Sequence, residues 1–311
     1  MKNLTTYLSI NNIIDDVKIW QPPFISNNFE TKNCRGEVKC DIKYNQLISM
    51  YEDLGLTKFD DEIITFSHIP NKPKYTLLLS AGMNGCELPG IFGLYYFIKF
   101  MLNSDEDGMQ WIKNNCTIYI IPCISQYSFD NCTYSNINGV NINRNFDYHN
   151  SWYAAMSNKD TWSYKGEYPM SEVETKFLYS WFKSHKNADL YIDCHSNVTM
   201  KNHNKLERTF EAIVSNNYIK SKVIGVQEKL YNIYNRKNWS PTKPYAYIPE
   251  PTSYPKIFIC QNEFNIPNIM IEQHSADKGH NGNGNVCSNA DLKNYITLLR
   301  AYILSCINKK G

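Results

Sequence analysis

Short apolar runs alternate with amphipathic stretches along most of the chain. The runs rich in β-branched and aromatic residues predict strands, most of them buried, because such residues fill a pleated, covered surface. The predicted strands are Ile63–Phe66, Tyr75–Ser80, Cys116–Ile124, Leu190–Cys194 and Asn268–Glu272.

Helical spacing of apolar positions appears between these runs and at both ends of the series. The predicted helices are Lys43–Leu54, Glu87–Leu102, Ser171–Ser184 and Asp291–Ile307. The third opens with Ser171 and Glu174, the spacing of a capping box at a helix start. Strands that alternate with helices predict an α/β fold, here a single domain whose central mixed and largely parallel sheet is flanked by helices.

The first part of the chain lacks this periodicity. Residues 1–37 are therefore predicted to be an N-terminal extension whose partner is unknown, and residues 38–311 to form the domain. The stretch Trp239–Pro255 holds five of the 13 prolines and predicts a long ordered loop.

Charge and cysteine content then limit the function classes. With 32 basic and 30 acidic residues the net charge is +2, which argues against a nucleic-acid partner. We see no signal peptide and no membrane span, and expect a cytoplasmic protein or one carried on a phage particle. The 10 cysteines are scattered without a CxxC pair, so a zinc ribbon is not indicated and reduced, buried thiols are expected.

Polar residues with catalytic potential follow the predicted strands. Asn84 and Glu87 come after Tyr75–Ser80, His195 comes directly after Leu190–Cys194, and Glu272 ends its strand. Ligands collect at the carboxyl ends of strands in open α/β sheets, so these side chains are expected to converge. Taken singly, His195 also fits a hydrogen-bonded structural role, and Glu87 fits the start of a helix.

Five segments, taken in order, resemble the zinc metallocarboxypeptidases of the carboxypeptidase A type, also called funnelins. The resemblance spans roughly residues 43–305 and implies a carboxypeptidase-like fold of the phosphorylase/hydrolase type. The segments are GMNGCELPG (82–90), NGVNINRNFD (138–147), YPMSEVET (168–175), DCHSN (193–197) and IMIEQ (269–273).

This resemblance implies roles for individual residues. Glu87 and His195 match two of three protein ligands of one Zn²⁺ ion, which leaves a position for a water of lowered pKa. Glu272 matches the general base. Asn143 and Arg144 match the pair that binds the terminal carboxylate of the substrate, a task suited to a planar guanidinium. The alternative for Arg144 is a surface ion pair.

Two positions depart from the family pattern. Asn84 stands where the family has its first zinc-binding histidine, so zinc binding is expected to be weak or absent. Cys86, in the same loop, is interpreted as a passive thiol. Tyr134 stands where bacterial members often have an oxyanion-stabilising arginine, and is predicted to be a catalytic, uncharged donor.

Other residues near the site stay open. The family uses a mobile tyrosine before the catalytic glutamate, and Tyr245, Tyr247 and Tyr254 are candidates. His274 lies two residues beyond Glu272, where it either lines the cleft, or compensates for Asn84, or packs in the core.

Three functions are consistent with the motifs. The first is a hydrolase that removes a C-terminal amino acid from a peptide or a peptidoglycan-type substrate with a free carboxylate. The second is a carboxypeptidase-fold binding or structural module without catalysis. The third is a deacylase of acyl amino acids.

Overall fold

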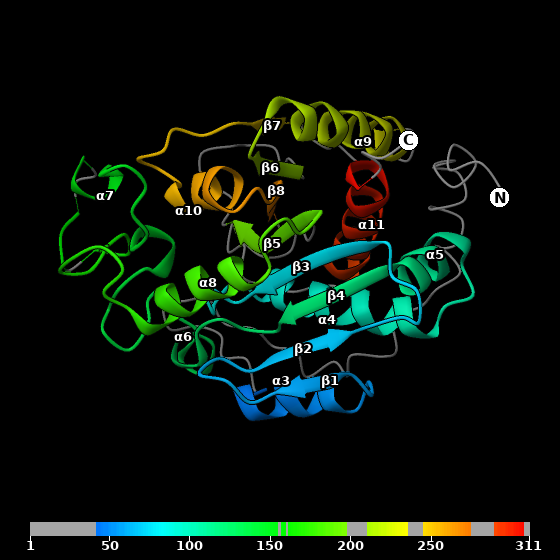
Figure 1. Ribbon diagram of the computed structural model, residues 1–311, viewed down its shortest axis with the longest axis horizontal. Coiled ribbons are helices and arrows are strands. Elements are labelled where there is room, and N and C mark those ends of the chain that lie inside the picture. The colour runs from blue at the N-terminus through cyan, green and yellow to red at the C-terminus, as the bar shows by residue number, and fades with distance from the viewer. Residues whose placement is uncertain are drawn as a thin grey trace.

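An eight-stranded sheet runs through the middle of the molecule in this computed structural model (Figure 1). The structure describes residues 42–154, 157–159, 161–197, 210–235, 245–274 and 289–307. From one edge to the other, the strands are β1 (Thr57–Phe59), β2 (Thr65–His68), β4 (Cys116–Ile121), β3 (Tyr75–Ala81), β5 (Leu190–Asn197), β8 (Asn268–His274), β6 (Phe210–Val214) and β7 (Tyr245–Tyr247).

The four central strands β4, β3, β5 and β8 are parallel to one another. Antiparallel pairs flank them, with β2 on β4, β1 on β2 and β6 on β8, while β7 pairs parallel to β6. The predicted single α/β domain with a mixed, largely parallel sheet is confirmed.

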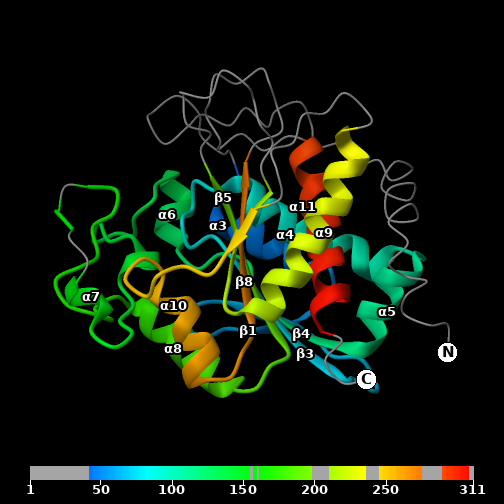
Figure 2. The same cartoon turned by 90° about the horizontal axis from the view of Figure 1, so that it is seen from above.

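Helices cover both faces of this sheet (Figure 2). One core cluster joins the sheet to α3 (Tyr44–Glu52), α4 (Leu88–Asn103), α5 (Asp107–Asn115), α9 (Asn217–Asn235) and α11 (Asn289–Cys306). The other joins it to α8 (Val173–Ser184) and to the π-helical turn Ile259–Glu263 that follows α10 (Pro255–Phe258). The remaining short elements are α6 (Gln126–Asn131), the 3₁₀ turn Ile142–Arg144 and α7 (Ser151–Ala154).

Strand β3 is apolar along its length because both of its faces are buried. Leu77 and Leu79 pack in the first cluster, whereas Leu78 between them packs in the second. Successive side chains of a strand point to opposite faces, and both faces are covered here.

Several predicted bounds need correction. The strand predicted at Ile63–Phe66 is β2, which starts at Thr65 because the chain is still turning before it. The capping box is wrong: helix α8 begins at Val173 without a side-chain cap. The Ser171 hydroxyl instead donates to Glu172 Oε1 at 2.5 Å and accepts from Asn145 Nδ2 at 2.9 Å.

The remaining predictions about long segments are tested only in part. Of the loop predicted at Trp239–Pro255, the structure describes residues 245–255, which contain strand β7 and the start of α10. The predicted extension, residues 1–37, lies outside the described residues. None of the described helices combines the length and apolarity that a membrane crossing requires.

Candidate functional site

Helix α4 packs directly against strand β5, and this contact brings Glu87 to His195. A Cβ atom on Gly90 would collide with the carbonyl of Cys194, so only glycine allows the approach. Glu87 precedes the first turn of α4, and its Oε2 lies 2.7 Å from His195 Nδ1. The backbone N–H of Ser196 donates to the same oxygen at 3.2 Å. The convergence expected for Glu87 and His195 is therefore observed, although His195 lies within β5 rather than after it.

On its other side, His195 contacts a buried carboxylate. Its Nε2 lies 2.9 Å from Asp193 Oδ2, and the Lys256 ammonium forms an ion pair with that oxygen. Ser80 donates to Asp193 Oδ1 at 2.8 Å. We call Glu87, His195, Asp193 and Lys256 the acid–base cluster; all four are at least 94% buried, since the most exposed, Glu87, keeps 6%.

In the acid–base cluster, acidic and basic side chains alternate in the order Glu87, His195, Asp193 and Lys256. Burial favours a neutral His195, but Asp193 and Glu87 outweigh it and raise the pKa of His195 to about 10. Burial opposes ionisation of Asp193 as well, yet Lys256 and His195 hold its pKa well below the ordinary value. The cluster thus sets two carboxylates against the His195 ring and the Lys256 ammonium.

Glu272 lies beside this cluster on strand β8. It is the register partner of His195 on β5 and of Glu211 on β6. Burial and the charge of Glu87 raise the pKa of Glu272 to about 8. A carboxyl group with such a pKa can donate a proton at neutral pH and accept one at mildly alkaline pH.

The side chain of Asn84 is hydrogen-bonded to the neighbouring loop. Its Nδ2 donates to the backbone carbonyl of Tyr134 at 2.8 Å and lies 3.4 Å from Asn141 Oδ1. The Tyr134 ring packs against Trp162, and its predicted role as an oxyanion donor stays a prediction. Cys86 is fully buried, which agrees with a passive thiol.

The residues that match the zinc ligands do not fit a tightly held zinc ion. Nowhere in the described part of the chain do three His, Cys, Asp or Glu side chains form a metal-binding group. Besides Glu87 and His195, the matching set offers only the neutral amide oxygen of Asn84. A catalytic zinc needs three protein ligands of carboxylate, imidazole or thiolate type. The side chain of His274 lies outside the described residues.

A second group of residues is held by the loop that contains the NINRN sequence. Asn141 Oδ1 accepts from the Asn143 N–H at 3.1 Å and so starts the 3₁₀ turn that carries Arg144. Downstream, Asn145 Oδ1 accepts from the Glu172 N–H at 3.1 Å. The Glu172 carboxylate in turn accepts from Asn136 at 2.7 Å. Glu172, in the SEVET segment, is therefore held by hydrogen bonds to this loop and has a structural role.

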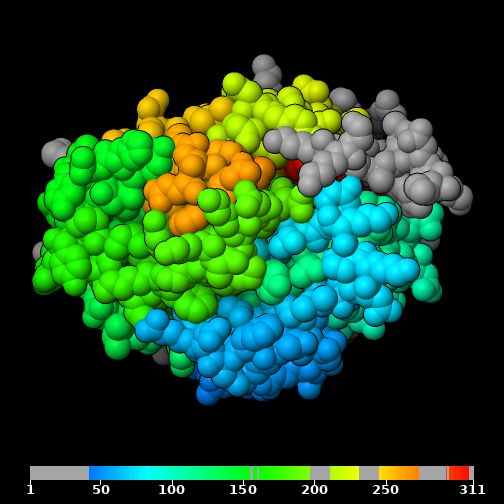
Figure 3. Space-filling model, viewed as in Figure 1, coloured from blue at the N-terminus to red at the C-terminus, as the bar shows by residue number. Residues whose placement is uncertain are grey.

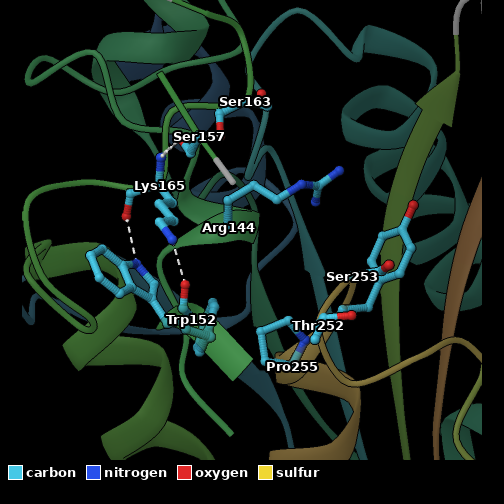
Figure 4. Close-up of a pocket in the computed structure, with 10 residues that line it drawn as sticks. Arg144, Trp152, Ser157, Ser163, Lys165, Thr252, Ser253 and Pro255 are labelled. Carbon is cyan, nitrogen blue, oxygen red and sulfur yellow. Dashed lines mark hydrogen bonds between the residues drawn. The ribbon is translucent and has the colours of Figure 1, made fainter. Parts of the chain in front are cut away.

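Arg144 is one of the residues that line a cavity (Figure 4). Its guanidinium is 5.2 Å from the centroid of the Tyr254 ring and 5.8 Å from that of Trp162. Within the described residues it has no carboxylate at ion-pair distance, so the surface ion pair is not observed. Nearby, Asn143 Nδ2 contacts Met270 Sδ at 3.7 Å, and its buried Oδ1 has no hydrogen-bond partner among the described residues.

The three candidate tyrosines lie in different surroundings. Tyr254 faces Arg144, and burial together with the Glu272 charge raises the pKa of its phenol. Tyr247 is hydrogen-bonded to Tyr254, and Tyr245 is half exposed at 51%. We call Asn143, Arg144 and Tyr254 the carboxylate subsite, after the ligand group that is proposed for them below.

The fold and the sequence both have known counterparts. Residues 53–205 match the family model of zinc carboxypeptidases. Bovine thrombin-activatable fibrinolysis inhibitor, solved with tick carboxypeptidase inhibitor, superposes with a TM-score of 0.61 at 15% identity over 85% of this chain and 94% of its own. The chain has the metallocarboxypeptidase fold.

Other structures with this fold give the same result. Carboxypeptidase A from Helicoverpa armigera has a TM-score of 0.61 at 15% identity, covering 100% of this chain and 83% of that one. A metallo-carboxypeptidase from Burkholderia cenocepacia has a TM-score of 0.58 at 11% identity, covering 85% and 68%. The chain thus resembles the carboxypeptidase A type, while none of the curated proteins matches it in sequence.

Two members of the acid–base cluster were missed by sequence reasoning. Asp193 lies two residues before His195 in a buried strand, and this spacing was a usable signal that both side chains share a face. Lys256 follows Pro255 in a region without strand or helix periodicity, so nothing local indicated that its ammonium is buried.

Proposed function

We propose that this protein binds the free C-terminus of a peptide in the manner of a carboxypeptidase. The observation that carries the proposal is Arg144, a guanidinium held at a cavity between Tyr254 and Trp162 without an acidic partner in the described residues. A guanidinium in that setting is suited to a carboxylate from outside, which it meets through two parallel hydrogen bonds.

The neighbours of Arg144 support a peptide ligand. Asn143 Oδ1 is a buried acceptor that no described residue bonds, and a bound N–H group of a peptide would satisfy it. The Tyr254 phenol, beside the guanidinium, offers a further donor to the ligand carboxylate. The chain therefore supplies both a charged anchor and a neutral acceptor at one place.

Hydrolysis of the terminal peptide bond is the second candidate, and Glu272 favours it. An ionised Glu272 can take a proton from a water whose oxygen attacks the terminal amide carbon, and can return it to the leaving amine. Because the pKa of Glu272 is raised to about 8, its ionised form becomes abundant only as the pH rises through that value. Amino acids released from ordinary or cell-wall-type peptides are the expected products.

The experiment for binding compares one peptide in two forms. Titration calorimetry with Ala-Ala-Leu and with its C-terminal amide is expected to show at least about tenfold tighter binding of the acid. Arg144→Met should abolish the difference, whereas Lys186→Met, at an exposed position, should leave it unchanged. Equal binding of the acid and the amide to the wild type would refute the proposal.

The experiment for hydrolysis measures free leucine released from the same peptide, with and without added zinc. Glu272→Gln is expected to abolish release while it preserves binding. Release that is unaffected by Glu272→Gln would show that this carboxylate is not the base. No release under either condition leaves binding as the function.

A further inference from the structure

One tryptophan beside the carboxylate subsite is largely exposed. Trp162 has an exposed fraction of 62%, although the centroid of its ring lies 5.8 Å from the Arg144 guanidinium and 6.3 Å from the centroid of the Tyr134 ring. The part of the chain that carries it, green in Figure 3, lies at the surface next to the orange segment that contains α10. An exposed indole at this place is available to a ligand held by Arg144, and its burial would add a large contact area.

The turn that carries Trp162 is attached to the same residue that positions Arg144. The Asn141 backbone N–H donates to the Tyr164 carbonyl at 2.8 Å, and Asn141 Nδ2 donates to the Trp162 carbonyl at 3.1 Å. Asn141 Oδ1 accepts from the Asn143 N–H at the start of the 3₁₀ turn that carries Arg144. One buried asparagine therefore fixes the backbone of the indole relative to that of the guanidinium.

The indole lies outside the cavity that Arg144 and Tyr254 line. This cavity has a volume of about 280 Å³, and Trp162 is not among its lining residues. A C-terminal side chain that enters the cavity would therefore leave the indole uncovered. Consecutive Cα atoms are about 3.8 Å apart, so the side chain of the preceding residue can reach a ring that lies 5.8 Å from the guanidinium.

The contacts of Trp162 indicate the same direction along the peptide. Its ring packs against Tyr134, whose backbone carbonyl accepts from Asn84 in the loop that leads to Glu87. The indole thus lies on the side of Arg144 that faces the acid–base cluster. A peptide whose carboxylate is at Arg144 and whose last amide bond is near that cluster brings its penultimate residue to this side.

We propose that Trp162 is a specificity-determining residue that stacks on the penultimate side chain of the bound peptide, so that peptides with an aromatic residue at that position are preferred. This rests on the proposed function, since Arg144 must hold the terminal carboxylate. An aromatic side chain offers the indole a flat face, and ring pairs gain attraction beyond the burial of their area.

The test compares two tripeptides, Ala-Phe-Leu and Ala-Ala-Leu, titrated calorimetrically into the full chain. The wild type is expected to bind Ala-Phe-Leu about three- to tenfold more tightly, the size of an aromatic pair. Trp162→Ala should remove this preference, and Trp162→Phe, which keeps a ring, should retain most of it. The matched control is Phe59→Ala, at an exposed ring on the edge strand β1, and it should leave the preference unchanged.

Each remaining outcome has a definite meaning. Equal affinity of the wild type for the two peptides, or a preference that survives Trp162→Ala, would overturn the assignment of Trp162. A preference for Ala-Ala-Phe over Ala-Ala-Leu that Trp162→Ala removes, without one for Ala-Phe-Leu, would place the C-terminal side chain on the indole and also overturn it. If Ala-Ala-Leu binds as an acid but not as its amide, the proposed function stands even when this inference fails. If neither tripeptide binds, both proposals fall together.

Discussion

The acid–base cluster and the carboxylate subsite differ in how their charges are balanced. In the acid–base cluster, Glu87 and Asp193 are each paired with a cation from the chain itself, through His195 and Lys256. In the carboxylate subsite, Arg144 meets aromatic rings and a cavity, with no acidic partner in the described residues. The first region is satisfied internally, whereas the second leaves its cation without a carboxylate among the described residues, as the proposed function requires.

This difference shows that binding and hydrolysis make separate demands on the same fold. Holding a terminal carboxylate needs a fixed cation, which Arg144 supplies. A zinc-dependent reaction needs three ligands of carboxylate, imidazole or thiolate type, and here Asn84 offers a neutral amide in place of one of them. The carboxylate subsite therefore carries the proposed binding function, whereas the acid–base cluster has the contacts of a buried ion network.

The largest expected effect comes from breaking the ion pair of the acid–base cluster. Lys256→Met leaves the buried Asp193 carboxylate without its cation and is expected to lower the free energy of unfolding by about 3–5 kcal/mol. Urea denaturation measures this change. The matched exchange Lys186→Met, at an exposed lysine, should change stability by less than about 0.5 kcal/mol. Equal effects of the two substitutions would show that Lys256 is not an integral cation.

The pH dependence of stability should come from the same region. The raised pKa of His195, about 10, stabilises the fold below pH 6.5 and loses that contribution as the pH rises toward 10. Glu272, with a pKa near 8, binds a proton more tightly in the folded state, so its contribution also falls between about pH 4.3 and 8. The lowered pKa of Asp193 stabilises the fold at neutral pH, and this contribution is lost only as the pH falls into the acid range.

Stability in the presence of a chelator is therefore expected to fall by about 2 kcal/mol or more between pH 6.5 and 9. Denaturation curves at fixed ionic strength measure the fall. Glu272→Gln, which cannot titrate, should flatten the profile. A profile that rises over this range would contradict the charge assignments.

Restoring a histidine should shift the acid–base cluster toward metal binding. Asn84→His replaces a neutral amide with the better ligand, and zinc affinity is expected to rise at least about tenfold. Zinc titration followed by calorimetry measures the gain, with Asn84→Ala as the control that removes the amide without adding a ligand. If Asn84→His binds zinc no better than Asn84→Ala, the missing histidine is not what limits zinc binding. The contacts of Asp193 with His195 and Lys256 would then be the cause.

The smallest expected effect lies in the carboxylate subsite. Tyr254→Leu removes the ring beside Arg144 and is expected to weaken peptide binding about two- to fivefold, the value of a partly exposed cation–π contact. Tyr245→Leu, at a half-exposed tyrosine that does not face Arg144, is the matched control. Equal losses in the two variants would remove Tyr254 from the carboxylate subsite.

Much of the fold was predictable from local pattern. The central strands were found because two-sided burial requires continuous apolar runs, as in Tyr75–Ala81. Edge strands such as Thr57–Phe59 were missed, since three residues with one exposed face give almost no periodic signal. The capping box at Ser171 failed because tertiary hydrogen bonds to Asn145 and Glu172 replaced the local one.

The candidate site was predictable only where motifs were contiguous. Glu87, His195 and Arg144 could be placed because their neighbours in sequence carry the family resemblance. Lys256 could not be placed, because its role depends on a contact with Asp193, 63 residues away, that only the folded chain creates. Long-range charge pairing of this kind leaves no trace in spacing or periodicity.

The most direct measurement of the central claim is the affinity for a free-acid peptide with and without a metal chelator. If the carboxylate subsite works independently of the acid–base cluster, Ala-Ala-Leu should bind equally well in both conditions, and Arg144→Met should weaken binding in both. Binding that disappears on chelation and returns with zinc would contradict the account, because recognition would then depend on a metal that the described residues do not fit.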